Sequence, residues 1–173
     1  MNNQKIAVLV AVLFLQFSIS AAESADNSSW GVNVQQVSEH VLSAGALEPD
    51  KIVDLAHSGV VAVVNLRFPG ESKYKEAPDV RAAGMDYISY PMKGEVPKPV
   101  FVAKFSSLIE KYEGQDILVH CASGNRVSVL WGAHLLDKGM ALNDVLQHVK
   151  LAATRKGSIA AIREYARLHH ADR

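Results

Sequence analysis

Short strand-forming runs alternate along the chain with stretches in which apolar residues recur every three or four positions. The runs lie at residues 41–45, 60–66, 86–90 and 117–120, and turn residues bound most of them. Short apolar runs of this length are typical of buried strands. The three-to-four-residue spacing predicts amphipathic helices, which we place at 49–58, 77–83, 101–112, 125–138, 143–153 and 158–169.

This alternation predicts an α/β fold with a central, mostly parallel sheet flanked by helices on both faces. Ligands in such sheets bind at the carboxyl ends of the strands. Cys121 directly follows the run at 117–120, and Asn65 and Arg67 lie where the run at 60–66 ends. We therefore expect these three residues at the same edge of the sheet.

The composition is that of an ordinary globular protein, since 49% of the 173 residues are hydrophobic and 21% are charged. A chain of this length can bury one core, so we predict a single domain over residues 23–173. Lys plus Arg number 18, and Asp plus Glu also number 18. This balance argues against nucleic acid or an anionic surface as a partner.

Residues 1–22 have the features of a secretory signal peptide. Lys5 gives a positive start, residues 6–15 form an apolar run too short to span a membrane, and small residues precede Glu23. We expect cleavage after Ala22, a periplasmic or secreted mature protein, and no stable membrane insertion after cleavage. An uncleaved membrane anchor and a buried N-terminal helix are the alternatives.

Cys121, the only cysteine of the chain, stands between a predicted strand and a predicted helix, on a loop of small residues. The first N–H groups of a helix lack partners, and the helix dipole places partial positive charge there. Such a loop can close around an anion and favours a thiolate. Arg126 adds a planar cation that can bind an oxyanion in two places. A small buried hydrophobe is the alternative for Cys121 taken alone.

The sequence His-Cys-Ala-Ser-Gly-Asn-Arg at 120–126 resembles the phosphate-binding loop of cysteine-dependent phosphatases, H-C-x-x-G-x-x-R. It is one residue shorter between Cys121 and Arg126. The shorter spacing is found in two groups: the rhodanese sulfurtransferases, and a bacterial family similar to dual-specificity phosphatases. The second group includes the phosphatase-like domain of the β-lactamase hydrolase-like proteins.

The rest of the chain resembles the phosphatase-like family from about residue 41 to about residue 153. Val-Asn-Leu-Arg at 64–67 and Ala-Gly-Met-Asp-Tyr-Ile-Ser-Tyr-Pro at 83–91 carry this resemblance. The acidic D-x-R element and the G-H-I-x-G-A turn that usually precede a rhodanese loop are both missing from the sequence. A rhodanese-like sulfurtransferase is therefore the second choice.

The resemblance implies a two-step phosphoryl transfer that needs neither a metal nor another cofactor. The Cys121 thiolate attacks phosphorus and forms a phosphocysteine, while the Arg126 guanidinium and loop N–H groups hold the oxygens. The phosphate-binding residues would be Ala122, Ser123, Gly124, Asn125 and Arg126. The implied partner is a phosphorylated protein or small molecule, as for tyrosine or dual-specificity phosphatases.

The chain departs from the family pattern at the residues that assist this chemistry. The general acid is expected on the loop at 91–99, whose only acid is Glu95; a solvated Glu95 is the alternative. Val127 replaces the usual hydroxyl residue after the arginine, and Ser128 follows one position later. These departures keep open a third possibility, a module that binds phosphate or sulfate without turnover.

Four residues are candidates for supporting roles: His120, Ser128, Asn65 and Arg67. His120 either tunes the neighbouring nucleophile or forms a hydrogen bond beneath the loop. Arg67 either lines the rim of the pocket or pairs with Glu71, four positions later.

Overall fold

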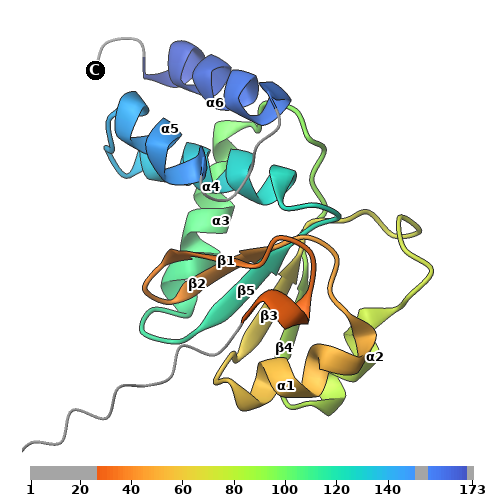
Figure 1. Ribbon diagram of the computed structural model, residues 1–173. Helices are drawn as coiled ribbons and strands as arrows, with labels where there is room; N and C mark the ends of the chain where they lie inside the picture. Colours follow the sequence, from red (N-terminus) through yellow and green to blue (C-terminus); the bar gives the residue numbers. More distant parts are fainter. Residues whose placement is uncertain (1–26, 151–155, 171–173) are drawn as a thin grey trace, which may run out of the picture.

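The computed structural model describes residues 27–150 and 156–170 (Figure 1). The strands of this part of the chain are β1 (Gln35–Ser38), β2 (Val41–Ala44), β3 (Ala62–Asn65), β4 (Asp86–Ser89) and β5 (Ile117–His120). The helices are α1 (Ile52–His57), α2 (Glu76–Ala82), α3 (Pro99–Lys111), α4 (Asn125–Asp137), α5 (Leu142–Lys150) and α6 (Lys156–His169), with short 3-10 helices η1 (Asn27–Trp30) and η2 (Pro49–Lys51).

The strands form one five-stranded sheet in the order β1-β2-β5-β3-β4. All neighbouring strands are parallel except β1 and β2, which form an antiparallel pair. The parallel register places the last residues of β2, β5, β3 and β4 in one row across the sheet: Ala44, His120, Asn65 and Ser89. The segments that follow these strands therefore leave the sheet at one edge.

Helices cover both faces of the sheet, with α3, α4, α5 and α6 on one side and α1 and α2 on the other (Figure 1). The alternation of side chains along each strand divides the core accordingly. On β5, Ile117 and Val119 belong to the cluster beneath α3 and α4, whereas Leu118 packs with residues of α1 and α2. Because His120 follows Leu118 by two positions, it faces α2.

The predicted fold class is confirmed, since a mostly parallel sheet lies between two layers of helices. The sequence pattern did not reveal β1, which is polar at three of its four positions. The helix predicted at 158–169 begins earlier, at Lys156, and the predicted end of the preceding helix at Ala153 lies outside the described residues.

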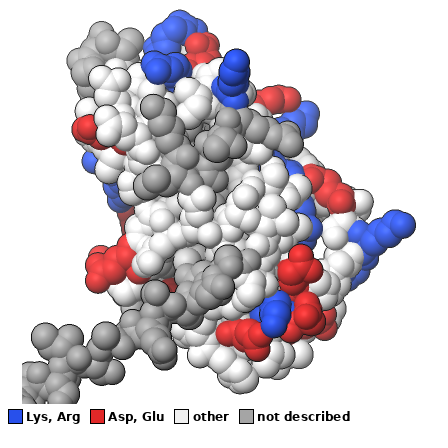
Figure 2. Space-filling model, viewed as in Figure 1, with Lys and Arg blue, Asp and Glu red and all other residues white. Residues whose placement is uncertain are grey.

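The predicted signal peptide at 1–22 also lies outside the described residues. Within the described ranges, no helix combines the length and apolar character needed to cross a membrane. Acidic and basic side chains are interspersed on the face drawn in Figure 2, and neither sign forms a continuous field there.

Candidate active site

Cys121 lies at the centre of the row of strand ends, where β5 passes into the loop before α4. Its backbone N–H donates to the Ala44 carbonyl at 3.2 Å, which extends the pairing of β5 with β2 by one residue. The Gly124 N–H donates to the Cys121 sulfur at 3.2 Å, so the loop folds back over the thiol. Gly124 has a φ of 85°. Glycine adopts this left-handed conformation without the steric cost that other residues incur.

The carbonyl oxygens of the loop are all directed away from its centre. The Ala122 carbonyl accepts from the Ala46 N–H at 3.1 Å, and the Ser123 carbonyl accepts from the Asn33 side-chain amide at 3.3 Å. The Gly124 carbonyl accepts from the Ser128 N–H at 3.0 Å, in the first turn of α4. The Cys121 carbonyl lies 3.3 Å from a ring nitrogen of His120.

This arrangement determines where the N–H groups of the loop point. In a trans peptide the C=O and the following N–H lie on opposite sides of the same plane. Outward carbonyls at 121–124 therefore turn the N–H groups of residues 122–125 inward, and the observed bond from Gly124 to the sulfur agrees with this. The loop is thus built to surround an anion with donors.

Side chains next to the loop hold this shape. The Asn125 amide donates to the Ser123 hydroxyl at 2.8 Å, and Ser158 of α6 lies 3.4 Å from both oxygens of Asn125. A β-carbon at Gly45 would lie 2.9 Å from Val32 atoms and 3.0 Å from the Ser123 α-carbon, so only glycine permits this approach. Four of the five predicted phosphate-binding residues are thus held in one loop by defined contacts.

Arg126 is fixed along one edge of its guanidinium group. Its Nη1 and Nη2 donate to the two carboxylate oxygens of Glu71 at 2.8 and 2.6 Å. Nη1 also lies 3.2 Å from the carbonyl oxygens of both Leu66 and Met92. A guanidinium group has five N–H donors. These contacts occupy three of them and leave the Nε and second Nη2 hydrogens, which form a fork able to bind two oxygens of one phosphate.

Arg126 and Glu71 each stabilise the charged form of the other. Hydrogen bonding from Arg126 lowers the pKa of Glu71 from 4.5 to about 2. The same bond raises the pKa of Arg126, and the nearby Cys121 sulfur contributes in the same direction when it is a thiolate. Arg126 is therefore permanently charged, held by Glu71 and electrostatically coupled to Cys121.

His120 lies beneath the loop and is fully buried. One ring nitrogen lies 2.8 Å from a carboxylate oxygen of Glu76, and the other lies 3.3 Å from the carbonyls of Gly45 and Cys121. The predicted hydrogen bond beneath the loop is therefore present. His120 joins the backbone of Cys121 to the first residue of α2.

Glu76 is the centre of a buried network that also contains two other predicted supporting residues, Asn65 and Arg67. Its carboxylate accepts from Arg67 and from the Asn65 amide, each at 2.5 Å, and the Asn65 amide oxygen accepts from the Arg67 backbone N–H at 2.8 Å. Burial alone would raise the pKa of Glu76, but His120 and Arg67 hold it below its ordinary value. The carboxylate therefore stays charged between His120 and Arg67.

One of the two alternatives for Arg67 is wrong. Arg67 does not pair with Glu71, because its side chain turns inward to Glu76 and is only 8% exposed. Glu71 binds Arg126 instead. The sequence interpretation assigned no role to Glu76, although Glu76 precedes the buried Val80 by four positions and so shares the apolar face of α2.

Ser128 makes no hydrogen bond to the Cys121 sulfur. Its hydroxyl donates to the Gly124 carbonyl at 3.2 Å, inside the first turn of α4, and its side chain is buried. Val127 is also buried and packs in the core beneath α4. Ser128 therefore shapes the loop through Gly124.

Glu95 is exposed on the loop between β4 and α3 and makes no hydrogen bond or ion pair with the described residues. This loop adjoins Arg126, because the Met92 carbonyl accepts from it and a β-carbon at Gly94 would lie 3.8 Å from the Arg126 γ-carbon. Glu95 also lines a groove of about 340 Å³ together with Phe68 and Met92. The predicted general acid, Glu95, therefore lies beside the candidate site and is exposed to solvent.

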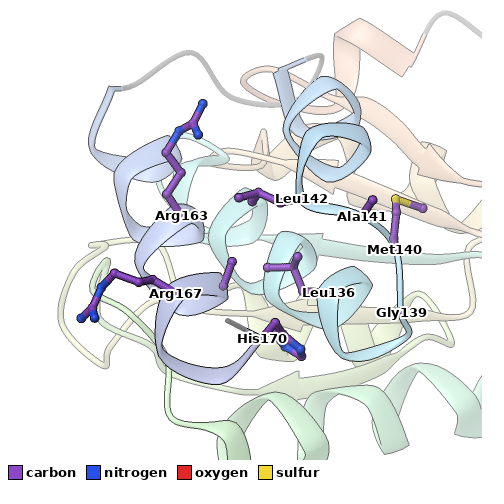
Figure 3. Close-up of a pocket in the computed structure, with 9 residues that line it drawn as sticks. Leu136, Gly139, Met140, Ala141, Leu142, Arg163, Arg167 and His170 are labelled. Atoms are coloured by element: carbon purple, nitrogen blue, oxygen red, sulfur yellow. The ribbon is translucent and has the colours of Figure 1, made fainter. Parts of the chain in front are cut away.

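The structure has a second cavity, which is separate from the candidate active site. A larger cavity of about 440 Å³ lies between α4, α5 and α6, and Leu136, Leu142 and Arg163 are among the residues that line it (Figure 3). It includes no residue of the Cys121 loop. Within the described ranges, no cluster of three or more His, Cys, Asp or Glu side chains is placed to hold a metal ion.

The sheet, together with the position of Cys121 between a strand and a helix, defines the class of protein to which this chain belongs. Solved structures of the same fold are cysteine-phosphatase-like. The family model "Beta-lactamase hydrolase-like protein, phosphatase-like domain" matches residues 33–136, and the chain belongs to this family. No curated protein matches the sequence. The resemblance inferred from residues 120–126 is therefore confirmed at the level of the family.

Several solved structures share the fold over most of their length. A DUF442 protein from Shewanella putrefaciens CN-32, named as a phosphatase candidate, is 25% identical with a TM-score of 0.66, and the match covers 84% of this chain and 96% of that one. A phosphatase candidate from Neisseria meningitidis Z2491 is 18% identical with a TM-score of 0.67, covering 78% and 99%. Tk-PTP in its active form is 19% identical with a TM-score of 0.66, covering 78% and 97%. Family and fold together support phosphatase function.

Proposed function

We propose that this protein is a cysteine-dependent phosphatase that hydrolyses phosphomonoesters through a phosphocysteine intermediate. One observation supports this above the others. The loop at 121–124 turns its carbonyls outward, and the free edge of Arg126 is electrostatically coupled to the sulfur that the loop surrounds. A dianionic phosphate matches this combination of inward N–H groups and a bidentate cation.

In the first step, the Cys121 thiolate attacks phosphorus and the bond from phosphorus to the ester oxygen breaks. Negative charge spreads over the three remaining oxygens in the transition state. The N–H groups of residues 122–125 and the Nε and Nη2 donors of Arg126 stabilise that charge. Because Glu71 already fixes the other edge of Arg126, little reorganisation is needed when phosphate binds.

In the same step, Glu95 gives its proton to the departing ester oxygen. It lines the groove that adjoins Arg126, which is where the leaving group would lie. In the second step, Glu95 accepts a proton from water as the water oxygen attacks phosphorus. The sulfur–phosphorus bond breaks, inorganic phosphate leaves, and the thiolate returns.

His120 and Glu76 act as positioning residues in this proposal. Through the Cys121 carbonyl, His120 orients the peptide that begins the loop. Glu76 in turn holds His120 and Arg67, and so anchors the segment that carries Glu71. The buried carboxylate of Glu76 thereby supports both parts of the site: the loop that carries Cys121, and the Glu71 carboxylate that acts as a clamp on Arg126.

A second function, phosphate or sulfate binding without turnover, is favoured by one observation. Glu95 is exposed and has no hydrogen-bond or ion-pair partner among the described residues, so nothing in that part of the chain holds it against a leaving group. We also propose that the substrate is a phosphorylated molecule met outside the cytoplasm, since residues 1–22 have the pattern of a signal peptide. We propose neither a nucleic acid partner nor a stable membrane insertion.

Hydrolysis of an aryl phosphate by the purified mature chain tests the proposal. We expect release of phosphate by the wild-type protein and none by Cys121→Ser. Conversion of cyanide and thiosulfate to thiocyanate, without phosphate release, would instead identify a rhodanese-like sulfurtransferase. Phosphate binding measured by calorimetry, without any turnover, would instead support the second function, binding without hydrolysis.

A further inference from the structure

A groove with an unusual charge distribution leads away from the candidate site. It measures about 340 Å³ and lies between the loop at 91–98, the start of α3 and the segment after β3. Two of its lining residues, Phe68 and Met92, contact the ion pair between Arg126 and Glu71. The Phe68 N–H donates to Glu71 at 2.8 Å, and the Met92 carbonyl accepts from Arg126 at 3.2 Å.

The walls of this groove are apolar. Val100 and Phe68 remain 61% and 40% exposed, which places them among the six exposed large hydrophobic residues in the described part of the chain. Val96 and Phe101 are half-buried against the core and continue the same lining. Exposed apolar surface that lines a groove beside a reactive group is typical of a surface that contacts ligand.

Lysines dominate the charge of the groove. Lys93, Lys98 and Lys104 line it, whereas Glu95 is its only acid. None of the three lysines forms a salt bridge with any described residue. Unpaired charges of one sign along a groove with low-dielectric walls raise the local concentration of ligands of the opposite sign.

We infer that this groove receives the leaving group of the substrate, and that the substrate is a small phosphomonoester with an apolar body and a second anionic group. The inference rests on the proposed phosphatase function, because the phosphate itself lies in the Cys121 loop. The volume of the groove is in the range of small-ligand sites, which hold a compact molecule rather than a long peptide. The apolar body contacts Phe68 and Val100, and the second anion lies among the lysines.

The test compares two esters that differ only in charge. One is a naphthyl phosphate with a carboxylate on the far ring, and the other is its carboxamide, which has the same shape and no charge. We expect the wild-type protein to hydrolyse the carboxylate with about fivefold higher kcat/KM, mainly through a lower KM. High salt should reduce this preference, because it screens exposed charges.

Two double variants that remove the same amount of charge test whether the preference for the carboxylate ester arises in the groove. In Lys98→Gln/Lys104→Gln the ratio of the two kcat/KM values should fall to about one, since the lysine charges are the source of the preference. In Lys73→Gln/Lys75→Gln, which removes the same charge from lysines that do not line the groove, the ratio should stay unchanged. Because the ratio is measured within each variant, a general loss of activity does not affect it.

The outcomes separate the inference from the proposed function. Equal rates on the two esters, or a preference that only the Lys73/Lys75 variant abolishes, would overturn the inference while leaving the phosphatase intact. A much stronger preference for an acidic phosphotyrosyl peptide over the carboxylate ester would also overturn it, in favour of a protein substrate. No hydrolysis of either ester, nor of phenyl phosphate, would instead reject the proposed function.

Discussion

Replacing Glu71 by glutamine tests whether the site depends on the clamp that orients Arg126. Hydrogen bonding from Arg126 lowers the pKa of Glu71 from 4.5 to about 2. Before screening, this corresponds to about 3 kcal/mol in favour of the charged carboxylate. The side chain is 33% exposed, so solvent reduces the contribution to about 1 kcal/mol. Glutamine also presents an N–H₂ group to one guanidinium nitrogen, which leaves two donors facing each other.

We therefore expect Glu71→Gln to lower kcat/KM for an aryl phosphate about 5- to 30-fold, the range that 1–2 kcal/mol produces. Glu164→Gln is the matched control. It breaks a similar two-bond pair with Arg167 on α6, at 2.7 and 2.6 Å, and should leave kcat/KM unchanged. Equal losses in the two variants, or none in Glu71→Gln, would refute the role assigned to the clamp.

The pH dependence of stability provides a second check of the same pair. A carboxyl group whose pKa is lower in the folded state stabilises the protein above its unfolded pKa, and the contribution is lost as the pH falls through the folded pKa. The difference in unfolding free energy between wild type and Glu71→Gln should therefore be full above pH 4.5 and shrink towards pH 2. Denaturant unfolding at several pH values measures it, and a difference that grows on acidification would contradict the assignment.

Three other predictions concern the remaining groups. Glu76→Leu should reduce the unfolding free energy by about 3–5 kcal/mol, because it leaves the buried Arg67 without its carboxylate; denaturant unfolding measures this, and a loss below about 1 kcal/mol would contradict it. Glu95→Gln should slow an alkyl phosphate about 10²–10⁴-fold and an activated aryl phosphate far less, and equal effects would exclude Glu95 as the acid. N-terminal sequencing of exported protein should begin at Glu23, and an intact Met1 in the membrane fraction would refute cleavage.

Much of the fold was predictable because its signals are local. Continuous apolar runs mark β3 and β5, and the three-to-four-residue spacing marks α3 and α4. β1 gave no such signal, since it is a short edge strand that pairs only with β2 and carries polar residues. Its position depends on a neighbouring strand rather than on its own pattern.

The part of the candidate site that lies within one short segment was predictable from the sequence. Cys121 and Arg126 lie five positions apart on one loop, so their association follows from local geometry. The partner of Arg126 was not predictable in this way. Glu71 is 55 positions distant, and the choice between Arg67 and Arg126 as its partner depends on which arginine turns inward.

The most direct test of the central proposal is the state of Cys121 during turnover of an aryl phosphate. Rapid quenching in acid, followed by mass spectrometry of the peptide that contains Cys121, detects a covalent adduct on its sulfur. We predict a phosphate on Cys121 that appears with substrate, is absent without it, and disappears as turnover ends. A persulfide on Cys121, or phosphate release by Cys121→Ser at the wild-type rate, would contradict the proposed mechanism.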